Sequence, residues 1–465
     1  MVSFKLARCS CLLCMIALLL LLIACRNSFS KQEGSAEGNT TSASVAVTVS
    51  QKDESEPIQS VENYKKTTRG KTLPSSTYSV NSKTTIEDED EPDMLLTIFD
   101  LEKYTEKLWK GNTVYHESVC FLEEKDGNIV SGNLLYTPNK MISMRSSDLE
   151  IEYQEGKDYI VKGNRLVLTK SSRIDAMPFD EYSPAYAAGA QKDWLVSDAD
   201  ASRYIAVTTD ILKHQVSVTY THKDSWTGYR PPSQLAELPI IKTMLEKKQP
   251  LKIVFYGDSI TAGWEASGVN ERVIDMSTLN EYTLASSRSP YMPSWSEMVC
   301  EKIEKVFKTN ITKINRGSGG AATPWGKTNA KKLVNSCSPD LVVIGFGMNQ
   351  VMASGNSFKV DIKAIINTIK EDCPRAEFLL VSCMVPNTEA ASFAGHHLAD
   401  QERELYQLQD EMSNTDIAVA PVYSMSSSML KAGKLYTDIS GNNLNHPNDF
   451  SIRLYAQTIL ATMGV

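Results

Sequence analysis

Strand and helix patterns alternate along the chain from about residue 236 to residue 465. Strand patterns occur at 251–256, 311–315, 341–346, 378–383 and 417–422, and the first of them is mostly apolar, as is typical of a buried strand. Apolar residues at helical spacing lie between or after these runs, near 298–307, 360–369, 401–412 and 452–463. This alternation predicts an α/β domain in which helices cover both faces of a parallel sheet, giving three layers.

A different pattern, in which apolar and polar positions alternate every second residue, dominates residues 94–235. Hairpin-like patterns occur at 118–131 and at 159–168, and an uninterrupted alternation occupies 215–221. Short strands at such spacing predict a smaller antiparallel β domain of the sandwich or jelly-roll type. The Pro-Pro pair at 231–232 ends the pattern, which places the domain boundary near residue 235. Carbohydrate binding and structural support are both open as the role of this domain.

The first 93 residues carry neither pattern. Lys5 and Arg8 precede an apolar run at 11–24 that is short for a membrane span and typical of an export signal. The residues after position 25 are rich in Ser, Thr, Glu and Lys and bury too little apolar surface to fold. We therefore expect a signal peptide over residues 1–24 and a disordered tether over residues 25–93.

The end of the apolar run, Leu22-Ile23-Ala24-Cys25, resembles the lipobox of bacterial lipoproteins. This resemblance implies that Cys25 is acylated and becomes the first residue of the mature chain. The implied location is extracytoplasmic, with the protein anchored to the bacterial cell membrane by its lipid. An uncleaved N-terminal anchor is the alternative, and it also places the bulk of the chain outside the cytoplasmic membrane.

Charge and cysteine content narrow the function further. The chain has 48 Lys and Arg against 56 Asp and Glu, a net charge of −8, so it has no general attraction for the phosphates of nucleic acid. Of its nine cysteines, the five outside the N-terminal segment have no spacing typical of a zinc site or a disulfide framework. No phosphate-binding or dinucleotide-binding glycine pattern is present. We expect no nucleic-acid partner, no metal and no cofactor.

Polar residues suited to acyl transfer follow the predicted parallel strands. Ser259 lies in Gly-Asp-Ser after the first strand, a glycine cluster at 317–320 follows the second, and Asn349 follows the third. His446 precedes the last helix. Each of these residues separately also fits a turn or a helix cap. Because ligands bind at the carboxyl ends of parallel strands, we expect the residues to meet at one edge of the sheet.

The four segments together resemble the SGNH (GDSL-type) hydrolase superfamily, over about residues 236–465. The resemblance implies that Ser259 is the nucleophile and that His446 is the general base. It also implies an oxyanion hole made by the backbone N–H groups of Ser259 and Gly320 and the side chain of Asn349. One departure is Gln350, which replaces an Asp of the third segment and is expected to alter packing without abolishing activity.

A second departure concerns the third member of the catalytic group. The superfamily has an Asp three residues before the histidine, where this chain has Asn443. An amide can orient a neutral imidazole but cannot stabilise imidazolium by charge. A Ser-His dyad helped by a backbone carbonyl, rescue by Asp438 or Asp449, and a weakened enzyme are the three alternatives, of which the dyad is preferred.

The resemblance to carbohydrate esterases of this superfamily includes the segment around Trp325, which is a candidate for stacking on a sugar ring. Tyr291 and Trp295 are candidates for lining the same cleft, and a place in the core is the alternative for each of these aromatic residues. The implied function is a serine esterase that removes acetyl groups from an extracellular polysaccharide. Its partners would be an acylated carbohydrate or another ester and, through the lipid, the membrane. Lipid or thioester hydrolysis, acyl transfer, and glycan binding by a catalytically decayed lipoprotein are the alternatives.

Overall fold

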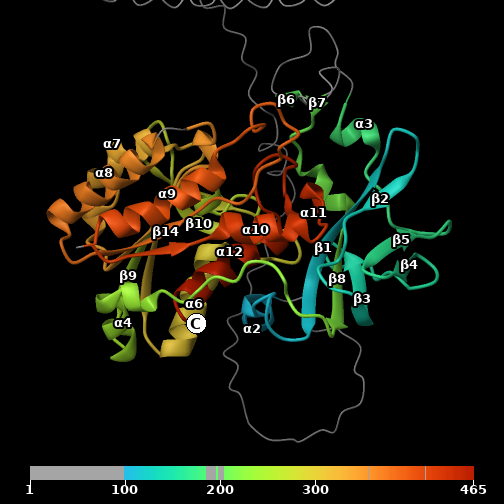
Figure 1. The fold of residues 1–465 in the computed structure, drawn as a ribbon, viewed down its shortest axis with the longest axis horizontal. Helices are drawn as coiled ribbons and strands as arrows, with labels where there is room; N and C mark the ends of the chain where they lie inside the picture. The colour runs from blue at the N-terminus through green and yellow to red at the C-terminus, as the bar shows by residue number, and fades with distance from the viewer. Residues whose placement is uncertain (1–98, 185–194, 197–203, 354–355, 414) are drawn as a thin grey trace, which may run out of the picture. The chain divides into compact units, whose positions relative to one another are not determined.

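The computed structural model describes residues 99–184, 195–196, 204–353, 356–413 and 415–465 (Figure 1). They belong to one compact unit, Asp88–Val465. The predicted signal peptide, Cys25 and the predicted tether all lie outside the described residues. None of the helices that the structure describes is long and apolar enough to cross a membrane.

A five-stranded parallel sheet forms the centre of the C-terminal region, as the strand and helix pattern predicted. Its strands lie in the order β12-β9-β13-β14-β15. They are β9 (Leu251–Gly257), β12 (Ile311–Gly317), β13 (Leu341–Gly345), β14 (Glu377–Val381) and β15 (Ile417–Ala420). The strand order reverses between β9 and β13, and the crevice at such a reversal is where open α/β sheets bind ligands.

Helices cover both faces of this sheet, so the predicted three-layer fold is confirmed. Ile253 and Phe255 of β9 belong to the core cluster that includes residues of α6 and α12, whereas Val254 and Tyr256 belong to the cluster beneath α7, α8 and α9. Alternate residues of a strand point to opposite faces, which explains why β9 has consecutive apolar residues from Ile253 to Tyr256. The helices are α4 (Pro239–Glu246), α6 (Trp295–Phe307), α7 (Thr323–Leu333), α8 (Ser357–Asp372), α9 (Leu398–Glu411), α10 (Val422–Lys431) and α12 (Asp449–Thr462).

Several elements of this region were not predicted, among them α4, α7, α10 and a β-hairpin. Helix α7 contains few apolar residues, and its Gly326 allows the ring of Phe346 to approach the backbone, so it shows no helical period. An antiparallel hairpin, β10 (Asn270–Ile274) and β11 (Glu281–Ala285), is inserted between β9 and α6. This hairpin matters because residues from it reach the site described below.

The β-rich region is antiparallel, as predicted. Its main sheet has the order β2-β1-β8-β3 and contains β1 (Thr113–Glu123), β2 (Ile129–Ser131), β3 (Pro138–Ser146) and β8 (Gln215–His222). Two hairpins accompany it, one formed by β4 (Tyr159–Lys162) and β5 (Arg165–Leu168), the other by β6 (Leu195–Val196) and β7 (Tyr204–Ile205). Two short helices, α2 (Leu101–Thr105) and α3 (Phe179–Tyr182), complete the region.

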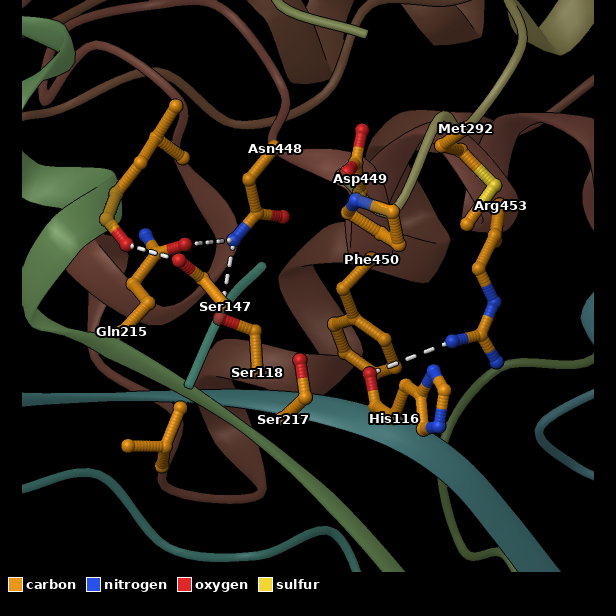
Figure 2. Close-up of a pocket in the computed structure, with 13 residues that line it drawn as sticks. His116, Ser118, Ser147, Gln215, Ser217, Met292, Asn448, Asp449, Phe450 and Arg453 are labelled. Carbon is orange, nitrogen blue, oxygen red and sulfur yellow. Dashed lines mark hydrogen bonds between the residues drawn. The ribbon is translucent and has the colours of Figure 1, made fainter. Parts of the chain in front are cut away.

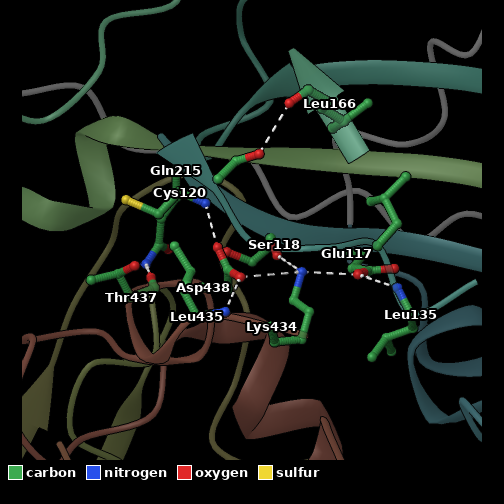
Figure 3. Close-up of polar contacts among 12 residues, drawn as sticks. Glu117, Ser118, Cys120, Leu135, Leu166, Gln215, Lys434, Leu435, Thr437 and Asp438 are labelled. Carbon is green, nitrogen blue, oxygen red and sulfur yellow. Dashed lines mark hydrogen bonds and ion pairs between the residues drawn. The ribbon is translucent and has the colours of Figure 1, made fainter. Parts of the chain in front are cut away.

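The β-rich region and the parallel-sheet region share one interior. Val119 and Val216 of the antiparallel sheet lie in the same core cluster as residues of α12. At the junction the buried ammonium of Lys434 lies 2.9 Å from Glu117 Oε1 and donates to the Ser118 carbonyl (Figure 3). Removing one partner of such a buried pair leaves an uncompensated charge. The β-rich region is therefore packed into the rest of the protein through a continuous interior.

Candidate active site

Ser259 lies directly after β9, at the start of the one-turn helix α5 (Ser259–Ala262). The Asp258 side chain caps this helix by accepting the N–H of Ile260 at 3.0 Å. Gly257 has no room for a Cβ atom because the carbonyl oxygen of Gly345 on β13 occupies that space. The close approach of β13 and the helix cap together fix the turn that presents Ser259 at the carboxyl edge of the sheet.

The structure brings His446 to Ser259. His446 Nε2 lies 2.9 Å from Ser259 Oγ, within hydrogen-bond distance for proton transfer. The segment 440–446, which we call the His446 loop, connects α11 (Tyr436–Ile439) to the residues before α12. Asn442 Oδ1 shapes this loop by accepting the backbone N–H groups of Leu444, Asn445 and His446, each at 3.0 Å. The predicted pairing of serine and histidine is thus present in the geometry.

Glu265 supplies the carboxylate behind the histidine. Its Oε1 atom lies 3.3 Å from His446 Nδ1, and both side chains are largely buried, at 14% and 12% exposure. Gly263, in the left-handed conformation with φ of 97°, ends α5 and turns the chain toward the histidine. A Cβ at Gly441 would lie 2.9 Å from Glu265 Cβ, so glycine is needed where the His446 loop meets this residue. Ser259, His446 and Glu265 therefore form a serine–histidine–carboxylate arrangement.

Asn443 does not occupy the third position, which corrects the sequence-based candidate. Its side-chain amide donates to the carbonyl oxygen of Ala206 at 3.1 Å and to that of Tyr182 at 3.4 Å. The residue has a φ of 62°, a left-handed conformation that Asn tolerates better than most residues. The amide is therefore engaged by the β-rich region, and Glu265 takes the place beside His446.

The two acidic alternatives, Asp438 and Asp449, are also engaged elsewhere. Asp438 accepts the N–H groups of Cys120 and Leu435, each at 2.7 Å (Figure 3). Asp449 accepts the N–H of Ser267 at 3.0 Å, and burial raises the pKa of both carboxyl groups. Their carboxylates serve the backbone and not the histidine.

Sequence reasoning missed Glu265 because it searched only around the histidine. The signal that was present is an acidic residue soon after the nucleophile, in Gly263-Trp264-Glu265, where the left-handed glycine returns the chain to the site. A carboxylate at that position becomes a candidate once the helix after Ser259 is known to be only one turn long.

The donors proposed for the oxyanion hole line the same cavity as Ser259. Gly320 has a φ of 76°, a conformation that favours glycine, and Asn349 lies in a 3₁₀ turn, Met348–Gln350, after β13. Asn349 Nδ2 donates to the Ala321 carbonyl at 3.1 Å, which fixes the amide orientation and leaves its second N–H for another acceptor. The arrangement provides donors from the ends of β12 and β13, the two strands that flank β9.

Gln350, the other departure from the superfamily pattern, has a structural contact. Its Oε1 atom accepts the backbone N–H of Thr323 at 3.2 Å, at the start of α7, and also contacts the Thr323 hydroxyl. The N–H groups at a helix start have no partner within the helix, so this contact satisfies one of them. Gln350 thus ties the residues around Asn349 to α7.

Replacing Asn349 by Ala is expected to lower kcat by roughly 10² to 10³, because one side-chain donor to the developing oxyanion is lost. KM should change little, since the oxyanion exists only along the reaction path. The measurement is steady-state hydrolysis of an aryl acetate, with Asn128→Ala at an exposed turn as the matched control. An unchanged kcat in the Asn349 variant would contradict this role.

The carboxyl group of Asp258, which caps α5 beside the nucleophile, is buried. Burial raises the pKa of Asp258 to about 6, although neighbouring N–H groups and His446 oppose the shift. With this pKa the carboxyl group of Asp258 is mostly ionised at neutral pH. Within the described ranges, no group of three or more His, Cys, Asp or Glu side chains is arranged to hold a metal ion.

A cavity of about 550 Å³ opens above Ser259. Two aromatic side chains line it with partly exposed surfaces: Trp264 is 37% exposed and Tyr282, on β11, is 38% exposed. The β-rich region contributes Val207 to the lining. The complete lining consists of Val207, Ser259, Trp264, Ile274, Asp275, Met276, Ser277, Tyr282, Gly319, Gly320, Asn349, Asn442, Asn445 and His446.

The aromatic residues predicted to bind substrate lie outside this lining. Trp295 is 1% exposed and donates its indole N–H to the Ile260 carbonyl, so it is a core residue. Trp325 donates to the Met276 carbonyl at 3.0 Å and supports the β10–β11 hairpin from outside the cavity. Tyr291 is exposed but does not reach the cavity. Trp264 and Tyr282 take the positions that these residues were expected to fill.

Comparison with known proteins bears on the class of this site. No curated protein matches the sequence significantly. A two-domain esterase active on acetylated mannans, co-crystallised with mannopentaose, is 20% identical, with a TM-score of 0.37 over 50% of this chain and 54% of that chain. This chain thus matches about half the length of that esterase. Axe2, an acetylxylan esterase from Geobacillus stearothermophilus, is 17% identical, with a TM-score of 0.35 over 46% of this chain and 94% of that chain.

A comparison with protein families gives a match that covers the catalytic residues of the site. Residues 255–450 match the GDSL-like Lipase/Acylhydrolase family. The matched segment contains Ser259, Gly320, Asn349 and His446, and also Glu265. It supports the predicted enzyme class, a serine hydrolase of esters. Residues 255–450 therefore form a GDSL-like lipase/acylhydrolase domain, as the sequence resemblance implied.

Proposed function

We propose that the protein is a cell-surface serine esterase that deacetylates a polysaccharide through an acyl-enzyme on Ser259. The observation that carries this proposal is the 2.9 Å contact between Ser259 Oγ and His446 Nε2, with Glu265 behind the histidine. A hydroxyl group becomes an effective nucleophile when a base of this kind can take its proton. Donors for an oxyanion lie in the same cavity.

The reaction follows from these positions. His446 accepts the Ser259 proton as Oγ attacks the ester carbonyl, and the carboxylate of Glu265 stabilises the imidazolium. The N–H groups of Ser259 and Gly320 and the amide of Asn349 hold the oxyanion. Collapse of the tetrahedral intermediate breaks the ester C–O bond, and the departing sugar hydroxyl takes the proton from His446. Water, activated by the same histidine, then releases the acyl group and restores Ser259.

The lining of the cavity supports an acetylated sugar as substrate. Trp264 and Tyr282 present partly exposed rings, which combine apolar faces with a polar group and suit the alternating apolar and hydroxyl surfaces of a pyranose. Met276 lies beside the proposed oxyanion hole, where its sulfur is 3.8 Å from the position of a Cβ on Gly320.

The proposed location rests on the N-terminal sequence. The lipobox resemblance at Cys25 and the polar segment that follows it are typical of a lipoprotein tethered outside the cytoplasmic membrane. A polysaccharide is an accessible substrate for an enzyme held there. Radiolabelled fatty-acid incorporation in a bacterial host, compared between the full chain and Cys25→Ala, tests the anchor separately from the activity.

Substrate choice is tested with acetate release from acetylated xylan and acetylated mannan, beside aryl esters of increasing chain length. We expect acetate from the glycans and a steep fall in rate beyond the acetyl ester. Fast release of long acyl groups would favour a lipase or thioesterase. Acyl transfer to added sugar would favour an acyltransferase, and glycan binding without release would favour a decayed enzyme. Each of these outcomes would overturn the proposed function.

Replacing Tyr282 by Ala is expected to lower kcat/KM on acetylated xylo-oligosaccharides by about fivefold, the effect of losing one good aromatic contact of roughly 1 kcal/mol. The loss on an aryl acetate should be smaller, because that ester has no sugar ring to stack. Tyr291→Ala is the matched control, since Tyr291 is exposed outside the cavity. Equal losses on both substrates would show that Tyr282 does not recognise the sugar.

A further inference from the structure

We propose that the β-rich region positions the catalytic histidine by holding the His446 loop in place. Asn443 is the main positioning residue. This inference rests on the proposed function and assigns a role to a region whose role the sequence left open. The position of the His446 loop, which carries the general base, then depends on both the β-rich region and the parallel-sheet region.

The side chain of Asn443 reaches into the β-rich region. It is 2% exposed, and its Nδ2 atom donates to the carbonyl oxygens of Ala206, next to β7, and of Tyr182, at the end of α3. Both partners are acceptors, so the position requires a hydrogen-bond donor. An amide meets this requirement and a carboxylate does not. The chemistry of the partners thus explains why an amide suits this position.

The parallel-sheet region also forms a hydrogen bond to Asn443. Asn387 Nδ2 donates to the backbone carbonyl of Asn443 at 2.8 Å. The neighbouring residue is also held, because the Thr208 N–H donates to the Asn442 carbonyl at 3.1 Å. Asn442 in turn accepts the N–H of His446 through its side chain. A continuous chain of hydrogen bonds therefore runs from residue 208 to the backbone of the catalytic histidine.

Gln215, at the start of β8, forms hydrogen bonds near both ends of the His446 loop. Its amide donates to the carbonyl oxygens of Thr437 at 2.7 Å and of Ser440 at 2.8 Å. Its oxygen accepts from Asn448 Nδ2 at 3.0 Å, and the same Asn448 amide donates to Ser118 of β1 (Figure 2). The strands of the antiparallel sheet thus hold both ends of the His446 loop.

Buried charged residues in and next to α11 also connect the His446 loop to the β-rich region. Asp438 of α11 accepts the N–H of Cys120 on β1, and Lys434, just before α11, pairs with Glu117 of the same strand (Figure 3). All of these side chains are buried. Displacing β1 would therefore disturb the helix that leads directly into the His446 loop. The β-rich region also reaches the substrate cavity itself through Val207.

The test uses the full chain and compares Asn443→Asp with Asn443→Ala. Asp restores the residue that the superfamily has at this position, but here it places a carboxylate against two carbonyl oxygens. We expect kcat to fall by about 10² in Asn443→Asp and about tenfold in Asn443→Ala, because small displacements of a catalytic group are costly. A rise in kcat for Asn443→Asp would overturn the inference. It would show that a carboxylate at position 443 supports His446 in catalysis, and that Asn443 is a weakened form of the superfamily's Asp.

A readout that does not depend on turnover separates positioning from general stability. The rate at which a fluorophosphonate labels Ser259 should fall in Asn443→Ala while the melting temperature changes little. Hydrogen exchange of residues 440–446 should become faster in the same variant. Asn128→Asp, at an exposed turn of the β-rich region, should leave labelling and exchange unchanged.

The outcomes distinguish this inference from the proposed function. If wild-type turnover depends on Ser259 but the Asn443 variants match the wild type in kcat, labelling and exchange, the esterase stands and the positioning role is wrong. If the wild type shows no turnover, the proposed function fails. In that case unchanged exchange of residues 440–446 in Asn443→Ala overturns the positioning role, and faster exchange supports it.

Discussion

Replacing Ser259 by Ala is expected to lower kcat by about 10⁶, the scale seen when the nucleophile of another serine hydrolase is removed. The residue starts α5 and is 4% exposed, so loss of one oxygen leaves the backbone turn and its Asp258 cap in place. Without Oγ no acyl-enzyme forms, and the histidine has no proton to accept. Acetate release from an aryl acetate and from acetylated xylan measures the effect.

The control for this variant is Ser171→Ala, an exposed serine of the β-rich region. It should retain wild-type kcat, and both variants should show the wild-type circular dichroism spectrum. Substantial acetate release by a folded Ser259→Ala protein would show that another residue performs the reaction. That result would contradict the proposed mechanism at its first step.

Replacing Glu265 by Gln is expected to lower kcat by about 10⁴, as observed when an amide replaces the carboxylate of a serine-protease triad. Gln keeps the size of the side chain that packs against Gly441, but it removes the charge that stabilises imidazolium. The histidine is then a poorer base when Ser259 attacks. Aryl acetate hydrolysis across a range of pH values measures the loss.

Asp449→Asn is the matched control for Glu265→Gln, because it makes the same exchange of carboxyl for amide at a residue that sequence analysis had considered for the same role. Asp449 accepts the N–H of Ser267, and an amide oxygen can do the same. We expect kcat to change far less than in the Glu265 variant. A large loss in Asp449→Asn with near-normal activity in Glu265→Gln would reverse the assignment.

The fold was predictable where local sequence reflects burial. Strand β13 is apolar throughout, and β9 is apolar apart from Lys252, because both faces of these strands are covered; this pattern is visible in the local sequence alone. Ser259, Gly320 and Asn349 follow successive strands, so the topology of a parallel sheet brings them to one edge. Their meeting with His446 could therefore be anticipated.

The third catalytic member was not predictable, because it depends on contacts between distant segments. Glu265 reaches His446 only because Gly263 turns the chain and Gly441 leaves room for its side chain. Asn443 faces carbonyl groups that are more than 200 residues away, and no local pattern indicates them. Sequence spacing suggested an acid before the histidine, and tertiary structure supplied one from beside the nucleophile.

The aromatic residues illustrate the same limit. Trp295 is enclosed by the core, whereas Trp264 lines the cavity. The difference arises from α6 packing against α12 and from the β10–β11 hairpin, which brings Tyr282 to the cavity. Whether an aromatic side chain is core or recognition surface is decided by such packing.

The most direct test of the central claim is to trap the acyl-enzyme. The full chain is mixed with an aryl acetate, quenched in acid within the first turnovers, digested and mapped by mass spectrometry. The account predicts one acetyl group on the peptide that contains Ser259, present while substrate remains and lost as water completes the reaction. Acetate release without acetylation of Ser259, or acetylation at another residue on the path to acetate, would contradict it.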